Sequence, residues 1–255
     1  MVDSERAVTN VPPITLDELL LADKPEQWAK LGFTVSGDTC QLGDVRVRLT
    51  GSAADDPPSR GIVGWRLRNI ANTDLDGLPT THSDCSAGAP TAPAAPSTVT
   101  ATTTAPAVAP TATATATTPH PNGVLSIDHV VAISPALDRS VATLQAAGLD
   151  LRRIREQPTP AGAPRQAFFR LGASLLELVQ EPDEVIARAG GSDRPAHFWG
   201  LALRVADLEH TVRQLGEHVS QIRPAVQPGR QIATLRRSAG LSAPIALMSC
   251  PPRAD

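Results

Sequence analysis

Ser126-Ile-Asp-His-Val-Val-Ala-Ile-Ser134, with the residues that follow it up to Glu181, decides the fold of this chain. Residues 127–133 are typical of a strand, because apolar and β-branched residues dominate the run. Leucine and valine then recur at helical spacing from Leu137 to Leu149, and Gly148 is placed to end that helix. Three short strands are predicted next, over 151–155, 165–171 and 174–180. The stretch therefore predicts a β-α-β-β-β unit.

The same unit recurs along the chain. Gly200-Leu-Ala-Leu-Arg-Val205 corresponds to His129-Val-Val-Ala-Ile-Ser134, and the helical run that begins at Asp207 corresponds to the run that begins at Ala136. Residues 14–72 follow the same order as a shortened copy plus the first strand of another. An internal repeat is therefore predicted, in which two complete copies pair.

These copies predict three segments. We expect a shortened N-terminal unit over 14–75, an Ala/Thr/Pro low-complexity linker over 85–119, and a complete domain of two β-α-β-β-β units over 124–250. The linker is predicted from its composition, because alternating Thr and Ala with frequent Pro bury too little apolar surface to offset the cost of ordering.

Composition excludes several classes of function. The net charge is −3, aromatic residues make up 3% of the chain and tyrosine is absent, so neither a basic face nor a stacking platform for nucleic acid is expected. No apolar run approaches the length of a membrane span. The N-terminus has no signal-peptide pattern, and the three cysteines form no CxxC pair, which favours a reducing compartment. A cytoplasmic protein without membrane or nucleic-acid partners is predicted.

Paired β-α-β-β-β units with a histidine on the first strand and a glutamate on the fourth resemble the vicinal oxygen chelate superfamily. That group contains glyoxalases, extradiol dioxygenases, an epimerase and bleomycin-resistance-type binding proteins. The local matches are Ile127-Asp-His-Val-Val-Ala132, Ala147-Gly-Leu149 and Leu171-Gly-Ala-Ser-Leu-Leu-Glu-Leu178. The resemblance implies an α+β fold, with curved mixed sheets around a concave pocket and helices outside.

The resemblance also implies a metal site. In such enzymes the first and fourth strands of each copy carry the ligands of a divalent ion such as Zn, Ni, Mn or Fe. His129 and Glu177 occupy two of these positions and are tentative metal ligands. The other two positions fall on Gly200 and Ala246, which have no donor side chain, whereas catalytic metals usually have three protein ligands. The N-terminal copy has Glu18 and Arg48 at the corresponding positions, and it also lacks a ligand pair.

Two functions are therefore carried forward. The first is a metal-free protein that binds a small polar metabolite or drug through His129, Glu177 and the nearby arginines Arg165, Arg170 and Arg204. The second is a divalent-metal-dependent lyase, isomerase or dioxygenase of the glyoxalase type. A degenerate pocket on an interaction scaffold is a third interpretation. His197-Phe198-Trp199 is either a packing cluster or an aromatic pocket wall. A homodimer is expected, because an incomplete N-terminal half leaves sheet edges to be covered.

Overall fold

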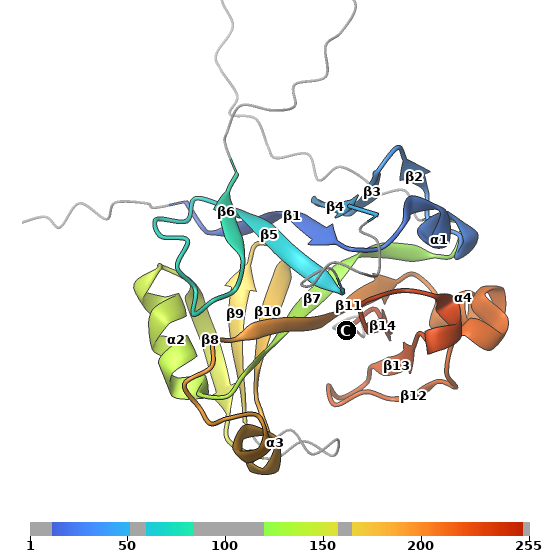
Figure 1. The fold of residues 1–255 in the computed structure, drawn as a ribbon. Coiled ribbons are helices and arrows are strands. Elements are labelled where there is room, and N and C mark those ends of the chain that lie inside the picture. The colour runs from blue at the N-terminus through green and yellow to red at the C-terminus, as the bar shows by residue number, and fades with distance from the viewer. Residues whose placement is uncertain (1–11, 52–59, 84–119, 158–164, 252–255) are drawn as a thin grey trace, which may run out of the picture.

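The structure is a computed structural model that describes residues 12–51, 60–83, 120–157 and 165–251. The linker predicted over 85–119 lies outside the described residues. Within them the chain forms two β-sheets with short helices at their margins (Figure 1). The predicted α+β class is confirmed.

An eight-stranded sheet forms the C-terminal half, in the order β12-β13-β14-β11-β7-β10-β9-β8. Its first unit consists of β7 (Val124–Ser134), α2 (Leu137–Ala146), β8 (Asp150–Arg155), β9 (Gln166–Leu171) and β10 (Ser174–Gln180). Its second unit consists of β11 (His197–Val205), α4 (Leu208–Leu215), β12 (Arg223–Pro224), β13 (Gln231–Thr234) and β14 (Ile245–Ser249). Helix α3 (Asp183–Arg188) and the 3-10 turns η1 (Gly216–His218) and η2 (Arg237–Ala239) complete this half. The strands and the helix predicted between 127 and 180 are confirmed.

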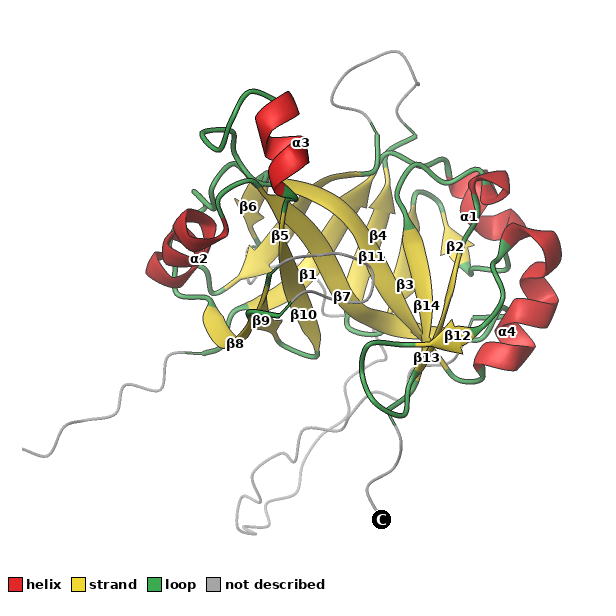
Figure 2. Cartoon of the chain, turned by 90° about the horizontal axis from the view of Figure 1, so that it is seen from below, coloured by secondary structure: helices red, strands yellow, loops and turns green. Residues whose placement is uncertain are grey.

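The two units meet where β7 pairs with β11 in antiparallel fashion. In each unit the last strand pairs in parallel with the first, β10 with β7 and β14 with β11. The first and last strands of both units therefore occupy the centre of the sheet. Helices α2 and α4 lie at opposite ends of it (Figure 2).

Helix α2 shows why the sequence periodicity was informative. Leu137, Val141 and Leu144 are buried, as a stripe with helical spacing predicts. Gly148 follows the helix with φ +94°, a left-handed conformation that glycine adopts without a side-chain penalty. In the described part of the chain, every helix is too short or too polar to span a lipid bilayer.

A six-stranded sheet forms the N-terminal half, in the order β2-β3-β4-β1-β5-β6. Its elements are β1 (Thr15–Leu21), α1 (Pro25–Lys30), β2 (Val35–Ser36), β3 (Thr39–Leu42), β4 (Val45–Leu49), β5 (Ile62–Arg68) and β6 (Thr80–His82). Strand β1 pairs in parallel with β4 and in antiparallel fashion with β5, as β7 does with β10 and β11. Strand β5 pairs in parallel with β6, as β11 does with β14.

One backbone contact recurs in both halves. The amide of Trp65 donates to the carbonyl of Pro79, and the amide of Leu201 donates to the carbonyl of Pro244, both at 3.1 Å. In each case the preceding residue is a glycine, Gly64 or Gly200, that faces the proline closely. Strand β6 therefore corresponds to β14. The short loop before β6 replaces the helix and two strands that precede β14 in the C-terminal half.

The two halves share one hydrophobic core, which includes Trp28, Trp65, Leu67, Val130 and Leu203. Figure 1 shows the N-terminal sheet lying across the C-terminal one. The rings of Trp65 and Phe198 meet edge-on, 4.9 Å between centroids.

Polar contacts join the halves around this core. Asp76 accepts hydrogen bonds from Arg139 and Ser140 of α2. His120 is buried between the halves, where its Nδ1 accepts from the amide of Thr34 at 2.9 Å and its Nε2 lies 2.9 Å from the carbonyl oxygen of Gln41. The shortened N-terminal half therefore packs against the C-terminal half as one folded body.

Candidate functional site

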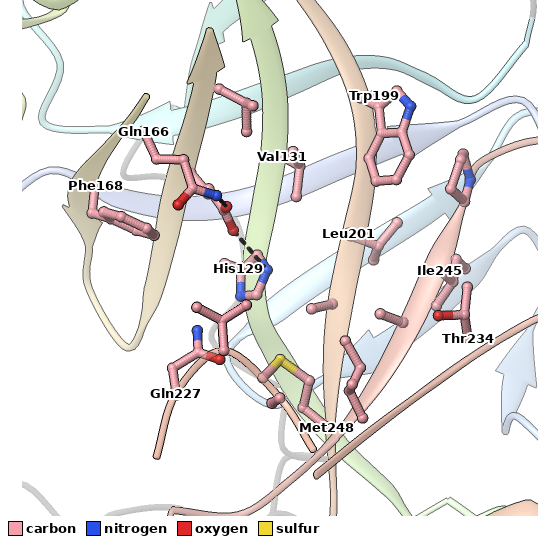
Figure 3. Close-up of a pocket in the computed structure, with 18 of the residues that line it drawn as sticks. His129, Val131, Gln166, Phe168, Trp199, Leu201, Gln227, Thr234, Ile245 and Met248 are labelled. Carbon is pink, nitrogen blue, oxygen red and sulfur yellow. Dashed lines mark hydrogen bonds and ion pairs between the residues drawn. The ribbon is translucent and has the colours of Figure 1, made fainter. Parts of the chain in front are cut away.

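A cavity of about 470 Å³ opens on the C-terminal sheet. Alternate residues of β7 point to opposite faces of the sheet. Val130 and Ala132 enter the core, whereas His129, Val131 and Ile133 line the cavity. Figure 3 shows His129 on β7, with Gln166 and Phe168 on one side and Trp199, Leu201 and Ile245 on the other. The cavity therefore lies between the two paired units.

A chain of hydrogen-bonded side chains crosses the floor of this cavity. His129 Nδ1 lies 3.0 Å from Asp128 Oδ1, and His129 Nε2 lies 3.2 Å from Glu177 Oε2. The side-chain amide of Gln166 donates to Glu177 from β9. The side chains of His129 and Glu177 are only 12% and 14% exposed. The predicted convergence of the histidine and the glutamate is thus present in the structure.

Asp128 reaches the same place because β7 is irregular at this point. His129 pairs with Ala202 and Ile127 pairs with Leu203, so Asp128 has no partner of its own on β11. Such a bulge turns a side chain that would otherwise face away from its neighbour. The same irregularity recurs on β11 at Trp199, between Phe198 and Gly200. One bulge brings a carboxylate to the imidazole, and the other brings an indole to the cavity.

Arginines hold Asp128 as an anion. Arg230 Nη2 lies 2.7 Å from Asp128 Oδ2, and Arg204 Nη2 lies 3.4 Å from the same atom. Burial by itself would raise the pKa of Asp128, but the hydrogen bonds from His129 and Arg230 hold that pKa well below its ordinary value. Asp128 is therefore a fixed acceptor that orients the imidazole.

The pKa of Glu177 shifts in the opposite direction. Burial raises the pKa of Glu177, and the nearby positive charges of His129 and Arg153 offset only part of that effect. A buried carboxyl with a raised pKa, beside an oriented imidazole in a cavity, is the kind of group found at functional sites.

The three predicted arginines are not in the cavity lining. Arg165 is held by Asp138 at 3.0 Å and by Glu156 at 2.7 Å. Arg170 lies 3.9 Å from Asp150. Arg204 contacts Asp128 and therefore supports the floor from behind. The interpretation of these three as residues that touch a ligand does not agree with where the structure places them.

Part of the chain matches a known protein family. Residues 126–244 match the sequence model of the Glyoxalase/Bleomycin resistance protein/Dioxygenase superfamily. Residues 126–244 are a domain of that superfamily. The resemblance stated above is thereby confirmed. None of the curated proteins compared with the chain matches it.

Solved structures with a similar fold align with about half of the chain. The methylmalonyl-CoA epimerase of Mycobacterium tuberculosis is 22% identical, with a TM-score of 0.42, over 51% of this chain and 91% of that one. A hypothetical protein from Bacillus halodurans C-125 is 17% identical, with a TM-score of 0.41, over 51% and 97%. A variant of the Streptomyces coelicolor methylmalonyl-CoA epimerase, in complex with 2-nitronate-propionyl-CoA, is 19% identical, with a TM-score of 0.41, over 52% and 99%. Likeness at this level does not extend to substrate or metal.

The glyoxalase-superfamily domain lacks the donors for a complete metal site. Gly200 and Ala246 lie where the second unit would carry the counterparts of His129 and Glu177, and neither has a donor atom in its side chain. A Cβ at Gly200 would stand 2.4 Å from the carbonyl oxygen of Pro244, so a ligand side chain has no room there. Within the described ranges, no three His, Cys, Asp or Glu side chains are placed so that they could hold one metal ion. The residues present do not fit a resident catalytic metal, for which three protein ligands are usual.

The corresponding pair in the N-terminal half forms an ion pair. Arg48 Nε lies 2.6 Å from Glu18 Oε1, and Arg66 Nε lies 3.2 Å from Glu18 Oε2. Glu18 is buried beneath these two arginines. The positions that would carry metal ligands therefore hold a structural salt bridge in this half.

Several functional residues were not predicted from the sequence. The strand pattern assigns Asp128 no role, because alternation alone does not show that a bulge brings it to His129. Gln166, Arg153, Arg155 and Arg223 line the cavity and were not singled out. Trp199 is half-exposed and lines the cavity, whereas Phe198 packs on Trp65, so both interpretations of His197-Phe198-Trp199 hold for part of it.

Proposed function

We propose that the glyoxalase-superfamily domain binds a small polar metabolite or drug in its cavity, without a full metal site. The observation that carries this proposal is the Asp128–His129–Glu177 chain, of which His129 and Glu177 line a mostly apolar cavity. Binding sites for small molecules typically combine apolar walls with a few placed polar groups that fix the orientation of the ligand.

The floor supports such orientation in two ways. Asp128 accepts from one nitrogen of His129, so the imidazole is held in place when a ligand approaches. Glu177 is held by Gln166 and His129, and it offers an acceptor inside the cavity. A ligand that donates a hydrogen bond to Glu177 would recover part of the cost of its burial.

A divalent-metal-dependent lyase, isomerase or dioxygenase is the second candidate. One observation favours it, because a carboxylate on the far nitrogen of a histidine is the arrangement that supports metal-binding imidazoles. The small number of metal-ligating side chains, described above, weighs against this candidate.

Metal analysis separates the two candidates. Protein purified without chelator should contain well below one Zn, Ni, Mn or Fe per chain, and added metal should not raise its melting temperature. Stoichiometric metal that is lost in both His129→Ala and Glu177→Ala would replace this proposal with the metal-dependent enzyme.

Thermal shift against a library of small polar molecules tests binding itself, since a ligand stabilises the fold according to its occupancy. Ala246→Phe narrows the cavity and should abolish the shift. Ala187→Phe, on the exposed side of α3, is the matched control and should retain it. A library without any selective hit would favour the scaffold interpretation.

A homodimer is part of the proposal. Strands β2 and β6 end one sheet, and β12 and β8 end the other, so both sheets have edges that a second copy could cover. Sedimentation at micromolar concentration should show a dimer, and a monomer throughout that range would contradict it. The cytoplasmic location and the absence of nucleic-acid partners stay predictions.

A further inference from the structure

We infer that the ligand of this cavity is an organic anion with an apolar body, a carboxylate or a phosphate ester whose charged group sits at Arg153 and Arg155, with the positive charge of Arg223 at the other end of the cavity. This inference rests on the proposed function and adds the chemical class of the ligand.

In the part of the chain that the structure describes, the arginines of the cavity lining have no carboxylate partner. Arg153 and Arg155 come from β8 and Arg223 comes from β12, so they reach the cavity from its two ends. Within the described ranges, none of the three has a carboxylate within 4.0 Å, whereas Arg48, Arg139, Arg165 and Arg194 each have one. An unpaired guanidinium beside a cavity is suited to planar, two-pronged recognition of carboxylate or phosphate oxygens.

One of these guanidinium groups is already held in position. Arg153 Cζ lies 4.6 Å from the centre of the Phe168 ring, a cation–π contact that fixes the side chain over the cavity wall. Phe168 lies on β9 next to Gln166, which holds Glu177. Arg153 and Glu177 line the same cavity, so one ligand can meet both groups.

The acidic groups of the cavity do not cancel this positive charge. Asp128 is neutralised from behind by Arg230, whose side chain is 9% exposed, and by Arg204. Among the described residues of the cavity lining, Glu177 is the one that carries a carboxylate, and it is held by His129 and Gln166. Three arginines against one glutamate leave the lining with a positive balance, which raises the local concentration of anions.

The rest of the lining is apolar and selects the body of the ligand. Val131, Val179, Leu201, Ile245 and Met248 line the cavity between the two polar ends. Trp199 is 50% exposed and forms one wall (Figure 3). A ligand with an apolar chain and one anionic end matches both parts of the surface, whereas a small inorganic anion would leave the apolar walls uncovered.

The test compares three probes with the same chain: octanoate, octyl phosphate and octanamide. Affinity is measured by calorimetry, and tryptophan emission reports the cavity, because Trp28 and Trp65 are fully buried and Trp199 is not. We expect both anions to bind at least about tenfold more tightly than the amide, and more weakly as salt rises. Arg153→Gln and Arg155→Gln should each weaken the tighter anion about tenfold and leave the amide unchanged, whereas Arg223→Gln, at the other end of the cavity, should weaken it less.

Arg152→Gln is the matched control, because Arg152 lies on the same strand, pairs with Asp150 and does not line the cavity. Tighter binding of octanoate would assign a carboxylate, and tighter binding of octyl phosphate would assign a phosphate ester. Equal affinities for acid and amide, with no effect of the arginine variants, would overturn the inference and leave the proposed function intact. Failure of all three probes, while the thermal-shift library still yields a neutral ligand, would overturn the inference as well.

Discussion

Asp128 lies within ion-pair distance of three side chains of the site, His129, Arg204 and Arg230. Its carboxylate is the counter-ion of Arg230, whose side chain is nearly buried, and it orients His129. Asp128→Asn leaves that cation without its counter-ion, and breaking such a buried pair costs about 3–5 kcal/mol. We expect a loss of about 3 kcal/mol in the free energy of unfolding in urea at pH 7. Asp150→Asn, at an exposed pair, is the control and should stay within about 0.5 kcal/mol of the wild type.

The same carboxylate predicts a pH dependence. Because its folded pKa lies below the ordinary value of 3.8, Asp128 stabilises the fold at pH values above 3.8, and this contribution is lost as pH falls toward the folded pKa. The difference between wild type and Asp128→Asn should therefore shrink below about pH 4. A difference that is constant from pH 7 to pH 3 would show that the charge of Asp128 is not its source.

The contribution of Glu177 to stability should depend on pH in the opposite direction. Its folded pKa lies above the ordinary value of 4.5, so it favours the fold at pH below 4.5, and that contribution is lost as pH rises through the folded pKa. At pH values above that folded pKa the wild type buries an ionised carboxylate, whereas Glu177→Gln does not. We expect the variant to melt a few degrees higher than wild type at pH 8, with the gain disappearing near pH 4.5. A lower melting temperature at pH 8 would show that the contacts of Glu177 with His129 and Gln166 outweigh the cost of burying it.

Sequence reasoning found the two central residues of the site and missed their partners. The resemblance to the superfamily indicated His129 and Glu177, which lie on the first and fourth strands of the unit, and these two strands lie side by side. Asp128 does not follow, because a bulge breaks the alternation from which facing side chains are predicted. The prediction that the arginines contact a ligand fails for another reason. Arg165 is near the site in sequence, but it forms ion pairs with Asp138 on α2 and with Glu156 just after β8.

At the scale of single elements, β11 shows how backbone packing limits the site. Gly200 faces the carbonyl of Pro244 at the start of β14, and Gly64 faces Pro79 before β6 in the same way. An added Cβ would be 2.4 Å from the carbonyl oxygen at Gly200 but 3.2 Å at Gly64. Overpacking of this kind typically costs about 1–3 kcal/mol. Gly200→Ala should therefore destabilise the protein by about 2–3 kcal/mol and Gly64→Ala by about 1 kcal/mol, measured by urea unfolding.

The comparison of these two variants also tests why the metal site is incomplete. If Gly200→Ala is as mild as Gly64→Ala, the strand can move aside, and a ligand side chain could be accommodated at this position. Equal stability of the two variants would therefore remove the steric argument against a metal site.

The elements that the sequence predicted are those with a clear period or length. Strands β7, β9 and β10 and helix α2 have apolar patterns long enough to define them. Strands β2 and β12 have two residues each, and β6 has three, so no periodicity exists to be read. Helix α3 has no buried residue, which removes the stripe that a sequence pattern needs. Pairing in the sheet, and not local propensity, determines these short strands.

For the whole molecule, the shared core predicts that the two halves fold together. Trp65 of the N-terminal half is 1% exposed and packs on Phe198 of the C-terminal half, and Asp76 binds α2. Residues 1–83 and 120–255, co-expressed as separate chains with a tag on one, should therefore copurify and melt in a single transition. Trp65→Asp places a charge in the core and should separate them. His82→Asp, at an exposed position on β6, should not. Fragments that purify apart would show that the covalent connection, and not the shared core, holds the halves together.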